Sequence, residues 1–185
     1  MALNITIKTN GITVTVQAVS DSNSQKISNQ MLAEMKFKAS KEVLSYTSTI
    51  NSLKLDMKSI AKKYNYNVKV TIISQLGTDQ LPFQATVDGR SMVPTLQNNQ
   101  NITALKTGDF KVGDIVIACH PKYGLIVKRV DIIKDENVYL KSDNRELQTF
   151  NTGITLSDGA EVCVFNGSLD TWQPVTNVIG VVKIY

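Results

Sequence analysis

The feature that most constrains the fold is a long stretch without helix-breaking residues. Gly11 is followed by no glycine until Gly77 and by no proline until Pro82. Within this stretch, apolar residues from Ser28 to Tyr64 recur at alternating spacings of three and four, which is typical of an amphipathic helix. The apolar positions are Leu32, Ala39, Val43, Tyr46, Ile50, Leu53, Met57, Ile60 and Tyr64. The pattern predicts a long helix over 28–64, with Ser28 as its N-cap.

The length of this helix leaves alternatives open. A continuous helix of roughly 36 residues would be about 54 Å long, which exceeds the size of a small domain. The helix therefore either bends, at the β-branched segment 46–49, or extends as a coiled-coil arm. We weigh two packing arrangements for it: an amphipathic helix on neighbouring strands, or a dimerising coil that makes the protein a homo-oligomer.

Strands are predicted on both sides of the helix. Leu3–Lys8 and Ile12–Val19 alternate apolar and polar residues around Asn10-Gly11, which predicts a β-hairpin. Asn67–Ser74 is a further strand, and Gln75–Leu81 is interpreted as a linker. The sequence therefore predicts an N-terminal hairpin, helix and strand module over residues 1–78 and a second domain over residues 79–185.

The second domain is predicted to be mostly β. Short apolar segments alternate there with turn pairs such as Gly113-Asp114 and Asp158-Gly159. The expected strands are Phe83–Val87, Ile102–Ala104, Ile115–Cys119, Leu125–Val130, Asn137–Lys141, Glu161–Phe165 and Val178–Ile184. Many short strands without a long helix predict coiled β-sheets or a partial barrel, so the whole chain is expected to be α+β.

Charge is distributed unevenly along the chain. Residues 1–80 hold ten lysines and five acidic residues, a balance of +5, whereas residues 81–185 hold ten basic and eleven acidic residues, a balance of −1. The basic helix is either a solvated face or a contact for a membrane surface or a protein partner. No basic motif interleaved with aromatic residues favours nucleic acid.

The length of the apolar runs indicates where in the cell the protein is expected. The longest are only a few residues, such as Ile115–Cys119, and the alternating N-terminus does not resemble a secretion signal. We expect a cytoplasmic protein, with peripheral attachment to a membrane left open. Two cysteines and one histidine argue against a structural zinc site, so neither a metal nor another cofactor is expected.

A serine and a lysine form the candidate chemical pair. Ser91 lies in a turn between Gly89 and Pro94, and Lys128 lies within the apolar run Leu125–Val130. A serine becomes a nucleophile when a base removes its proton, and a lysine is such a base when burial lowers its pKa. Taken alone, a lysine in a strand more often extends its amine to solvent. The two residues together predict a Ser-Lys hydrolase.

The segments around this pair carry a family resemblance. They are Asp88-Gly89-Arg90-Ser91-Met92-Val93-Pro94-Thr95-Leu96, Gly113-Asp114-Ile115-Val116, Val127-Lys128-Arg129-Val130 and Lys141-Ser142-Asp143-Asn144-Arg145. In content and order they closely resemble type I signal peptidases, which share a clan with the self-cleaving LexA-type repressors. The resemblance covers roughly residues 85–145 and implies a signal-peptidase or LexA-like catalytic domain. Residues 1–80 resemble no family, so a docking or regulatory role is expected for them.

The resemblance implies roles for the central residues. Ser91 would attack the scissile carbonyl, and Lys128 would accept the proton and pass it to the leaving amine. The Ser91 N–H would form part of the oxyanion hole. Gly89 stands where some members supply a hydroxyl, so a side-chain donor is absent there. Met92 would line the substrate cleft.

Supporting roles follow from the same resemblance. Asp143 matches an acidic segment that supports the active-site strands, although its usual preceding glycine is Ser142 here. Arg129 completes the Lys-Arg pair that is found in the bacterial type.

Three functions are weighed. The first is a serine endopeptidase that cleaves a protein precursor or peptide, with small residues at the −1 and −3 positions by family resemblance. Its substrate would bind as an added strand. The second is a LexA-like self-cleaving regulator. The glycines before Ser91 follow Asn10, Leu76 and Asp88, which gives no Ala-Gly or Cys-Gly site. The third is a non-catalytic binding module on the same fold.

Overall fold

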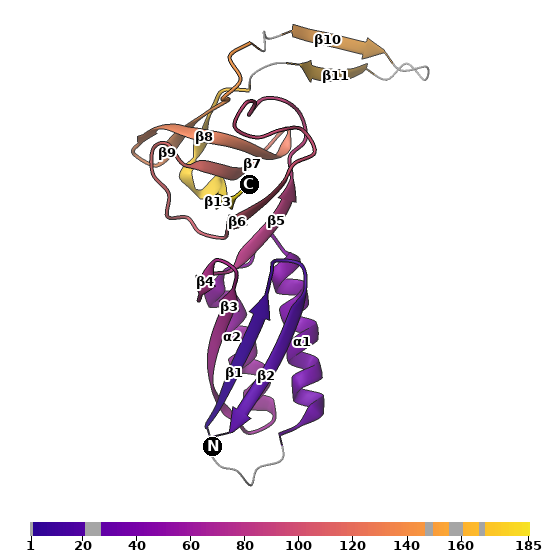
Figure 1. Ribbon diagram of the computed structural model, residues 1–185, viewed down its shortest axis with the longest axis vertical. Helices are drawn as coiled ribbons and strands as arrows, with labels where there is room; N and C mark the ends of the chain where they lie inside the picture. The colour runs from indigo at the N-terminus through magenta and orange to yellow at the C-terminus, as the bar shows by residue number, and fades with distance from the viewer. Residues whose placement is uncertain (1, 21–26, 147–149, 156–160, 167–168) are drawn as a thin grey trace.

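The computed structural model describes residues 2–20, 27–146, 150–155, 161–166 and 169–185, with Ala2, 150–155 and 161–166 as backbone only. Two sheets make up most of it (Figure 1). The strands of the first sheet all precede Leu81 in the sequence, and the strands of the second sheet follow it. The predicted reactive residues, Ser91 and Lys128, belong to the second part of the chain. A separate pair, β10 (Phe150–Thr155) and β11 (Glu161–Asn166), is antiparallel.

The first sheet has the strand order β2-β1-β3-β4, and two helices cover one of its faces (Figure 1). Its elements are β1 (Ala2–Thr9), β2 (Val14–Ser20), α1 (Asn29–Leu44), α2 (Ile50–Lys63), β3 (Asn67–Ser74) and β4 (Gly77–Thr78). β1 is antiparallel to β2 and parallel to β3. Alternate residues of β1 (Leu3, Ile5 and Ile7) pack with buried side chains of both helices, because successive side chains of a strand point to opposite faces. The predicted hairpin and third strand are confirmed.

The helix predicted over 28–64 is interrupted at the segment where a bend was considered. Two helices are joined by a turn at 45–49, so the prediction of one continuous helix is wrong. The Thr49 side chain accepts from the Ser52 N–H at 3.0 Å, and the Ser52 hydroxyl accepts from the Thr49 N–H at 2.9 Å. This capping box begins α2 in place of a further turn of α1. The second helix therefore packs against the first, and the coiled-coil arm does not form.

A buried lysine that directly follows the strand Asn101–Leu105 of the second sheet fixes this turn. Lys106 is 9% exposed. Its Nζ has four acceptors within hydrogen-bond distance, which its three N–H groups share: the carbonyls of Glu42 (3.1 Å), Val43 (2.9 Å) and Ser45 (2.5 Å), and Ser48 Oγ (2.8 Å). A positive charge at the C-terminus of a helix is favourable because the last carbonyls lack partners within the helix. Lys106 therefore joins the end of α1 to the second sheet.

Replacing Lys106 with methionine is expected to lower the free energy of unfolding by about 3 kcal/mol, because buried carbonyls lose their donor. Urea denaturation followed by circular dichroism measures the change. The matched control is Lys111→Met, which removes an exposed lysine from a nearby loop and should change stability by less than about 0.5 kcal/mol. Equal effects of the two substitutions would contradict this role for Lys106.

The linker predicted at Gln75–Leu81 is also wrong. Gly77–Thr78 turns back to pair with the end of β3, with Ser74 opposite Gly77. Leu81 is 1% exposed and belongs to the core between the first sheet and its helices. That residues 1–78 and 79–185 form two separately folding domains stays a prediction.

The second sheet has seven strands in the order β12-β9-β8-β7-β13-β6-β5, with antiparallel neighbours throughout. Its strands are β5 (Pro82–Thr86), β6 (Asn101–Leu105), β7 (Ile115–His120), β8 (Gly124–Lys134), β9 (Asn137–Lys141), β12 (Thr171–Pro174) and β13 (Val178–Ile184). A 3₁₀ turn, Val175–Asn177, precedes β13. Two buried clusters pack on this sheet. The sheet curls into a half-barrel, which confirms the predicted α+β fold class (Figure 1).

The curled sheet leaves two strand edges available. β5 is the last strand of the order, so one of its edges has no partner strand among the described residues. Within the same part of the chain, β8 pairs with β9 only from Arg129 onward, so the corresponding edge of Gly124–Lys128 is unpaired. Because four antiparallel steps separate β5 from β8, the two strands run parallel to each other.

No helix in the described part of the chain has the length and apolar character needed to cross a membrane.

Candidate active site

Ser91 lies in a turn that follows β5 and is held on both sides. Gly89 has a φ of +92°, a left-handed conformation that glycine adopts without strain. The Gly89 N–H donates to Asn98 Oδ1 at 2.8 Å. Met92 and Leu96 are 1% and 0% exposed, and they anchor the turn in the core. The half-buried Ser91 therefore occupies a fixed position.

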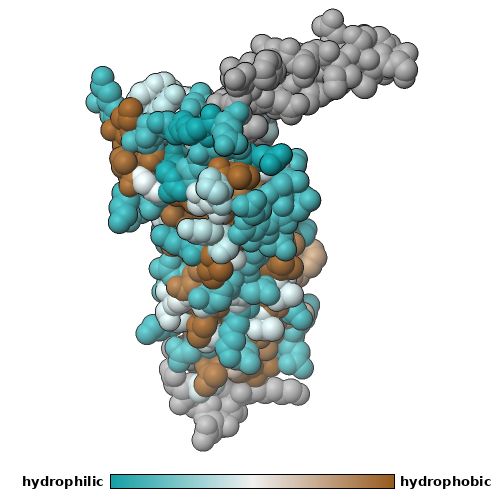
Figure 2. Space-filling model, turned by 45° about the horizontal axis from the view of Figure 1, so that its top comes forward, coloured by the Kyte–Doolittle hydropathy of each residue, from teal (hydrophilic) through white to brown (hydrophobic). Residues whose placement is uncertain are grey.

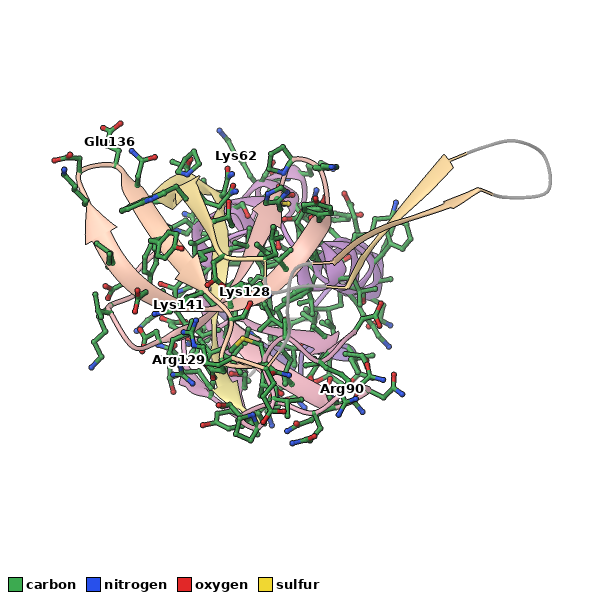
Figure 3. The ribbon with its side chains drawn as sticks, turned by 90° about the horizontal axis from the view of Figure 1, so that it is seen from above. Lys62, Arg90, Lys128, Arg129, Glu136 and Lys141 are labelled. Atoms are coloured by element: carbon green, nitrogen blue, oxygen red, sulfur yellow. The ribbon has the colours of Figure 1, made fainter. Side chains whose placement is uncertain are left out.

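Lys128 meets Ser91 from the opposite strand. It lies on β8 opposite Val116 of β7, and only 4% of it is exposed. Its Nζ lies 2.7 Å from Ser91 Oγ and 3.1 Å from Ser142 Oγ. Figure 3 looks onto this end of the molecule, with Lys128 and Arg129 near the middle of the curved sheet. The structure thus brings the two residues of the predicted pair within hydrogen-bond distance.

The surroundings of Lys128 favour its neutral form. Burial lowers the pKa of Lys128 to about 8, although the negative charges of Asp170 and Asp143 act in the opposite direction. Desolvation has this effect because the charged ammonium loses its hydration in an apolar site. A substantial fraction of the amine is therefore unprotonated near pH 8.

Arg129 and Asp143 form a two-pronged ion pair beside this site. Arg129 Nε donates to Asp143 Oδ1 at 2.8 Å, and an Arg129 terminal nitrogen donates to Asp143 Oδ2 at 2.6 Å. The other terminal nitrogen donates to the Gly113 carbonyl at 2.7 Å. Burial would raise the pKa of Asp143, but hydrogen bonds from Arg129 and Thr95 and the charges of Arg129 and Arg145 hold it below its ordinary value. The predicted supporting residues therefore meet in a charged pair that ties β8 to the end of β9.

Ser142, Asn144 and Asp170 also contribute to this site, and no role was predicted for Ser142 or Asp170. The Asn144 N–H donates to the Ser91 carbonyl at 2.9 Å, and Asn144 Nδ2 donates to the Arg90 carbonyl at 2.9 Å. Ser142 is 0% exposed, and its hydroxyl oxygen accepts a hydrogen bond from Lys128 Nζ. The Ser142 N–H donates to Asp170 Oδ1 at 2.8 Å. These contacts fix the nucleophile turn and the lysine relative to each other.

The sequence offered an uneven signal for these three residues. Ser142 and Asn144 flank Asp143 within a segment that carries the resemblance, so their proximity to the site could have been expected. Asp170 lies 28 residues beyond Ser142, in a segment without a recognisable pattern.

A cleft of about 740 Å³ opens beside Ser91 and Lys128. The free edges of β5 and β8 form its two walls, so an extended peptide has backbone partners on both sides. Its apolar lining comprises Phe83, Ala85, Val87, Ile102, Ile117, Leu125, Ile126, Val127 and Leu169. Ser91 and Lys128 lie toward the C-terminal end of the two parallel walls, and Phe83 and Leu125 lie toward the other end.

The remaining predicted residues lie in different places. Gly89 lines the cleft, but its N–H is already bonded to Asn98. The Ser91 N–H has no acceptor among the described residues, which leaves it available to an oxyanion. Met92, which the resemblance places in the substrate cleft, is 1% exposed, packs in the core beneath the turn and is not among the residues that line the cleft.

The described side chains include no group of three His, Cys, Asp or Glu residues placed to hold a metal ion. The groups that the site does provide are a hydroxyl, a buried amine, a free backbone N–H and an open cleft. Together they can supply a nucleophile, a proton acceptor and an oxyanion donor.

A family model described as Peptidase S24-like matches residues 50–162, which span α2 to the start of β11. The match includes Ser91, Lys128 and Asp143. No curated protein matches the chain.

Proposed function

Because the chain belongs to the Peptidase S24-like family, we propose that it is a serine endopeptidase with Ser91 as nucleophile and Lys128 as general base. The observation that carries the proposal is the 2.7 Å separation of Ser91 Oγ from the nearly inaccessible Lys128 Nζ. A lysine of lowered pKa beside a serine is a known means of activating the hydroxyl.

The reaction proceeds in two halves. Neutral Lys128 Nζ takes the proton from Ser91 Oγ while the oxygen attacks the scissile carbonyl carbon. The Ser91 N–H stabilises the resulting oxyanion, and Lys128 then gives its proton to the leaving amine as the C–N bond breaks. Lys128 next takes a proton from water, which attacks the acyl-enzyme ester. As the ester bond breaks, the proton returns to Ser91 Oγ, and the carboxylic acid product leaves and releases its own proton to solvent.

The substrate is a protein precursor or peptide in extended form. It adds as a strand between the edges of β5 and β8, where backbone hydrogen bonds are available to it. Small residues at the −1 and −3 positions are expected from the resemblance to signal peptidases. Cleavage of a separate chain is the primary proposal.

Self-cleavage is the second candidate function. The Peptidase S24-like match favours it because the LexA-type self-cleaving repressors belong to the same clan. In that case the cleft would receive a segment of this chain instead of another protein.

The decisive test incubates the full chain with a preprotein-type peptide that contains an Ala-x-Ala site. Mass spectrometry follows both the peptide and the protein. Cleavage of the peptide after the second alanine is the expected result. Cleavage of the protein alone would replace the primary proposal with self-cleavage. If both remain intact in buffer, with detergent and with lipid vesicles, the peptidase proposal is wrong.

The cleavage rate should rise with pH. The base must be neutral, and burial lowers the pKa of Lys128 to about 8. The neutral fraction therefore increases roughly tenfold between pH 7 and pH 9, and kcat/KM should follow it. Initial rates across pH 6–10 on one peptide measure the profile, with circular dichroism to show that the fold persists. A rate that falls over this interval would mean that the protonated lysine is the active form.

A further inference from the structure

The loop that joins β1 to β2 touches one wall of the cleft. The carbonyl of Asn10 accepts from Gln84 Nε2 at 2.7 Å and from Gln75 Nε2 at 3.1 Å. Gly11 packs so closely that a Cβ atom there would lie 3.0 Å from Gln84 Cγ and 3.4 Å from the Pro82 backbone. Gln84 belongs to β5 and lines the cleft. This loop, residues 10–13, therefore packs on the first residues of β5, on the face opposite to Phe83 and Ala85, which belong to the apolar lining of the cleft.

The same loop is fixed internally. Asn10 Oδ1 accepts from the N–H groups of Ile12 at 3.0 Å and Thr13 at 2.8 Å. The Gly11 N–H donates to Thr9 Oγ1 at 3.0 Å, and Gly11 has a φ of +91°. At its centre, Ile12 is 59% exposed. An ordered loop thus holds an apolar side chain in solvent beside the start of β5.

The direction of the cleft leads toward this loop. From Val87 to Gln84, the β5 wall extends about 10 Å away from the Ser91 turn at roughly 3.3 Å per residue. The opposite wall ends near Leu125, which is 44% exposed. A peptide strand that adds to the edge of β5 and continues to Gln84 therefore presents alternate side chains to the face on which residues 10–13 pack.

This surface is distinguished by its contact with β5, a strand that lines the cleft. It is not distinguished by the size of an apolar patch. Figure 2 shows hydrophobic atoms in several separate places, interrupted by hydrophilic ones. Ile12 differs from other exposed apolar residues, such as Val19 on β2, because its loop is bonded to a strand that lines the cleft.

We propose that the β1–β2 loop extends the substrate-binding site, and that Ile12 contacts an apolar side chain of the substrate about five residues from the scissile bond. The inference rests on the proposed function. The substrate is then an extended polypeptide with an apolar segment at that distance on one side of the cleavage point. The first sheet thereby contributes to specificity, although it supplies no group that reacts.

The test compares peptides of two lengths on the full chain. The short peptide has three residues on either side of an Ala-x-Ala cleavage point. Two long peptides carry four further residues on each side, either leucines or serines. The wild type should cleave the leucine peptide with a kcat/KM about fivefold above that of the serine peptide, as expected for partial burial of one apolar side chain. Ile12→Ser should remove most of this gain.

Val19→Ser is the matched control, because it removes a side chain that is 63% exposed on the adjacent strand. It should preserve the fivefold preference. Equal rates for the leucine and serine peptides with the wild type would overturn the inference. So would an Ile12→Ser variant that retains the preference, or a Val19→Ser variant that loses it to the same degree.

A binding measurement separates this inference from the peptidase proposal. Fluorescence anisotropy with labelled peptides on the Ser91→Ala variant needs no turnover. If no peptide is cleaved but the leucine peptide binds about fivefold more tightly than the serine peptide and Ile12→Ser abolishes that difference, only the peptidase proposal fails. If the peptides are cleaved but binding and rates show no dependence on Ile12, only the inference fails.

Discussion

Replacing Ser91 with alanine is expected to abolish peptide cleavage, lowering kcat/KM by about 10⁴-fold or more. The reason is that the only hydroxyl at the mouth of the cleft within reach of Lys128, among the described residues, is lost; Ser142, the other hydroxyl on this lysine, is 0% exposed and cannot meet a substrate carbonyl. Initial rates on the Ala-x-Ala peptide, with mass spectrometry of the products, measure the loss.

The control for this substitution is Ser59→Ala, which removes an exposed hydroxyl from α2. It should leave kcat/KM unchanged, and both variants should unfold at nearly the same temperature as the wild type. Retention of more than about a tenth of the wild-type rate by Ser91→Ala would exclude Ser91 as the nucleophile.

Replacing Lys128 with methionine should have an effect of similar size, because a serine without a base is a weak nucleophile. Lys128→Arg should be equally inactive, since a guanidinium stays protonated and cannot accept the serine proton. The methionine variant should nevertheless be at least as stable as the wild type, because an apolar side chain of similar length replaces an amine that is only 4% exposed. Rates are measured as above, and urea denaturation gives the stability.

Lys141→Met serves as the control for the lysine variants. Lys141 lies on β9 and pairs with Asp131 at 3.6 Å, with 34% of its side chain exposed. It should keep nearly full activity. An active Lys128→Arg variant would show that position 128 needs a positive charge and would refute its role as a base.

The reactive pair could be predicted because its chemistry depends on short local patterns. The Gly89 turn and the apolar run around Lys128 each identified a residue type in an unusual setting, and the resemblance joined them. The position of Met92 was harder to predict, since an apolar residue after a nucleophile can either line a substrate cleft or pack in the core. Only the packing of the turn decides between the two, and it places Met92 in the core.

The break between the helices shows a different limit. Thr49 and Ser52 fit the polar face of a continuous helix as well as they fit a capping box, so periodicity could not distinguish the two. The deciding contact comes from Lys106, which lies 61 residues after Ser45 and bonds its carbonyl. Asp170 was missed for the same reason, because its partner Ser142 is distant in sequence. Local patterns carry no record of such long-range hydrogen bonds.

The bond between Ser142 and Asp170 has a consequence for the timing of activity during synthesis. The Ser91 turn leaves the ribosome first, Lys128 follows 37 residues later, and Asp170 emerges a further 42 residues on. The first sheet and both helices can complete their contacts well before that. The backbone of Ser142, whose hydroxyl orients the lysine, gains its carboxylate partner only after Asp170 has been synthesised. While the residues between Ser91 and Asp170 are being added, the growing chain therefore carries its nucleophile without the full set of contacts that position the base.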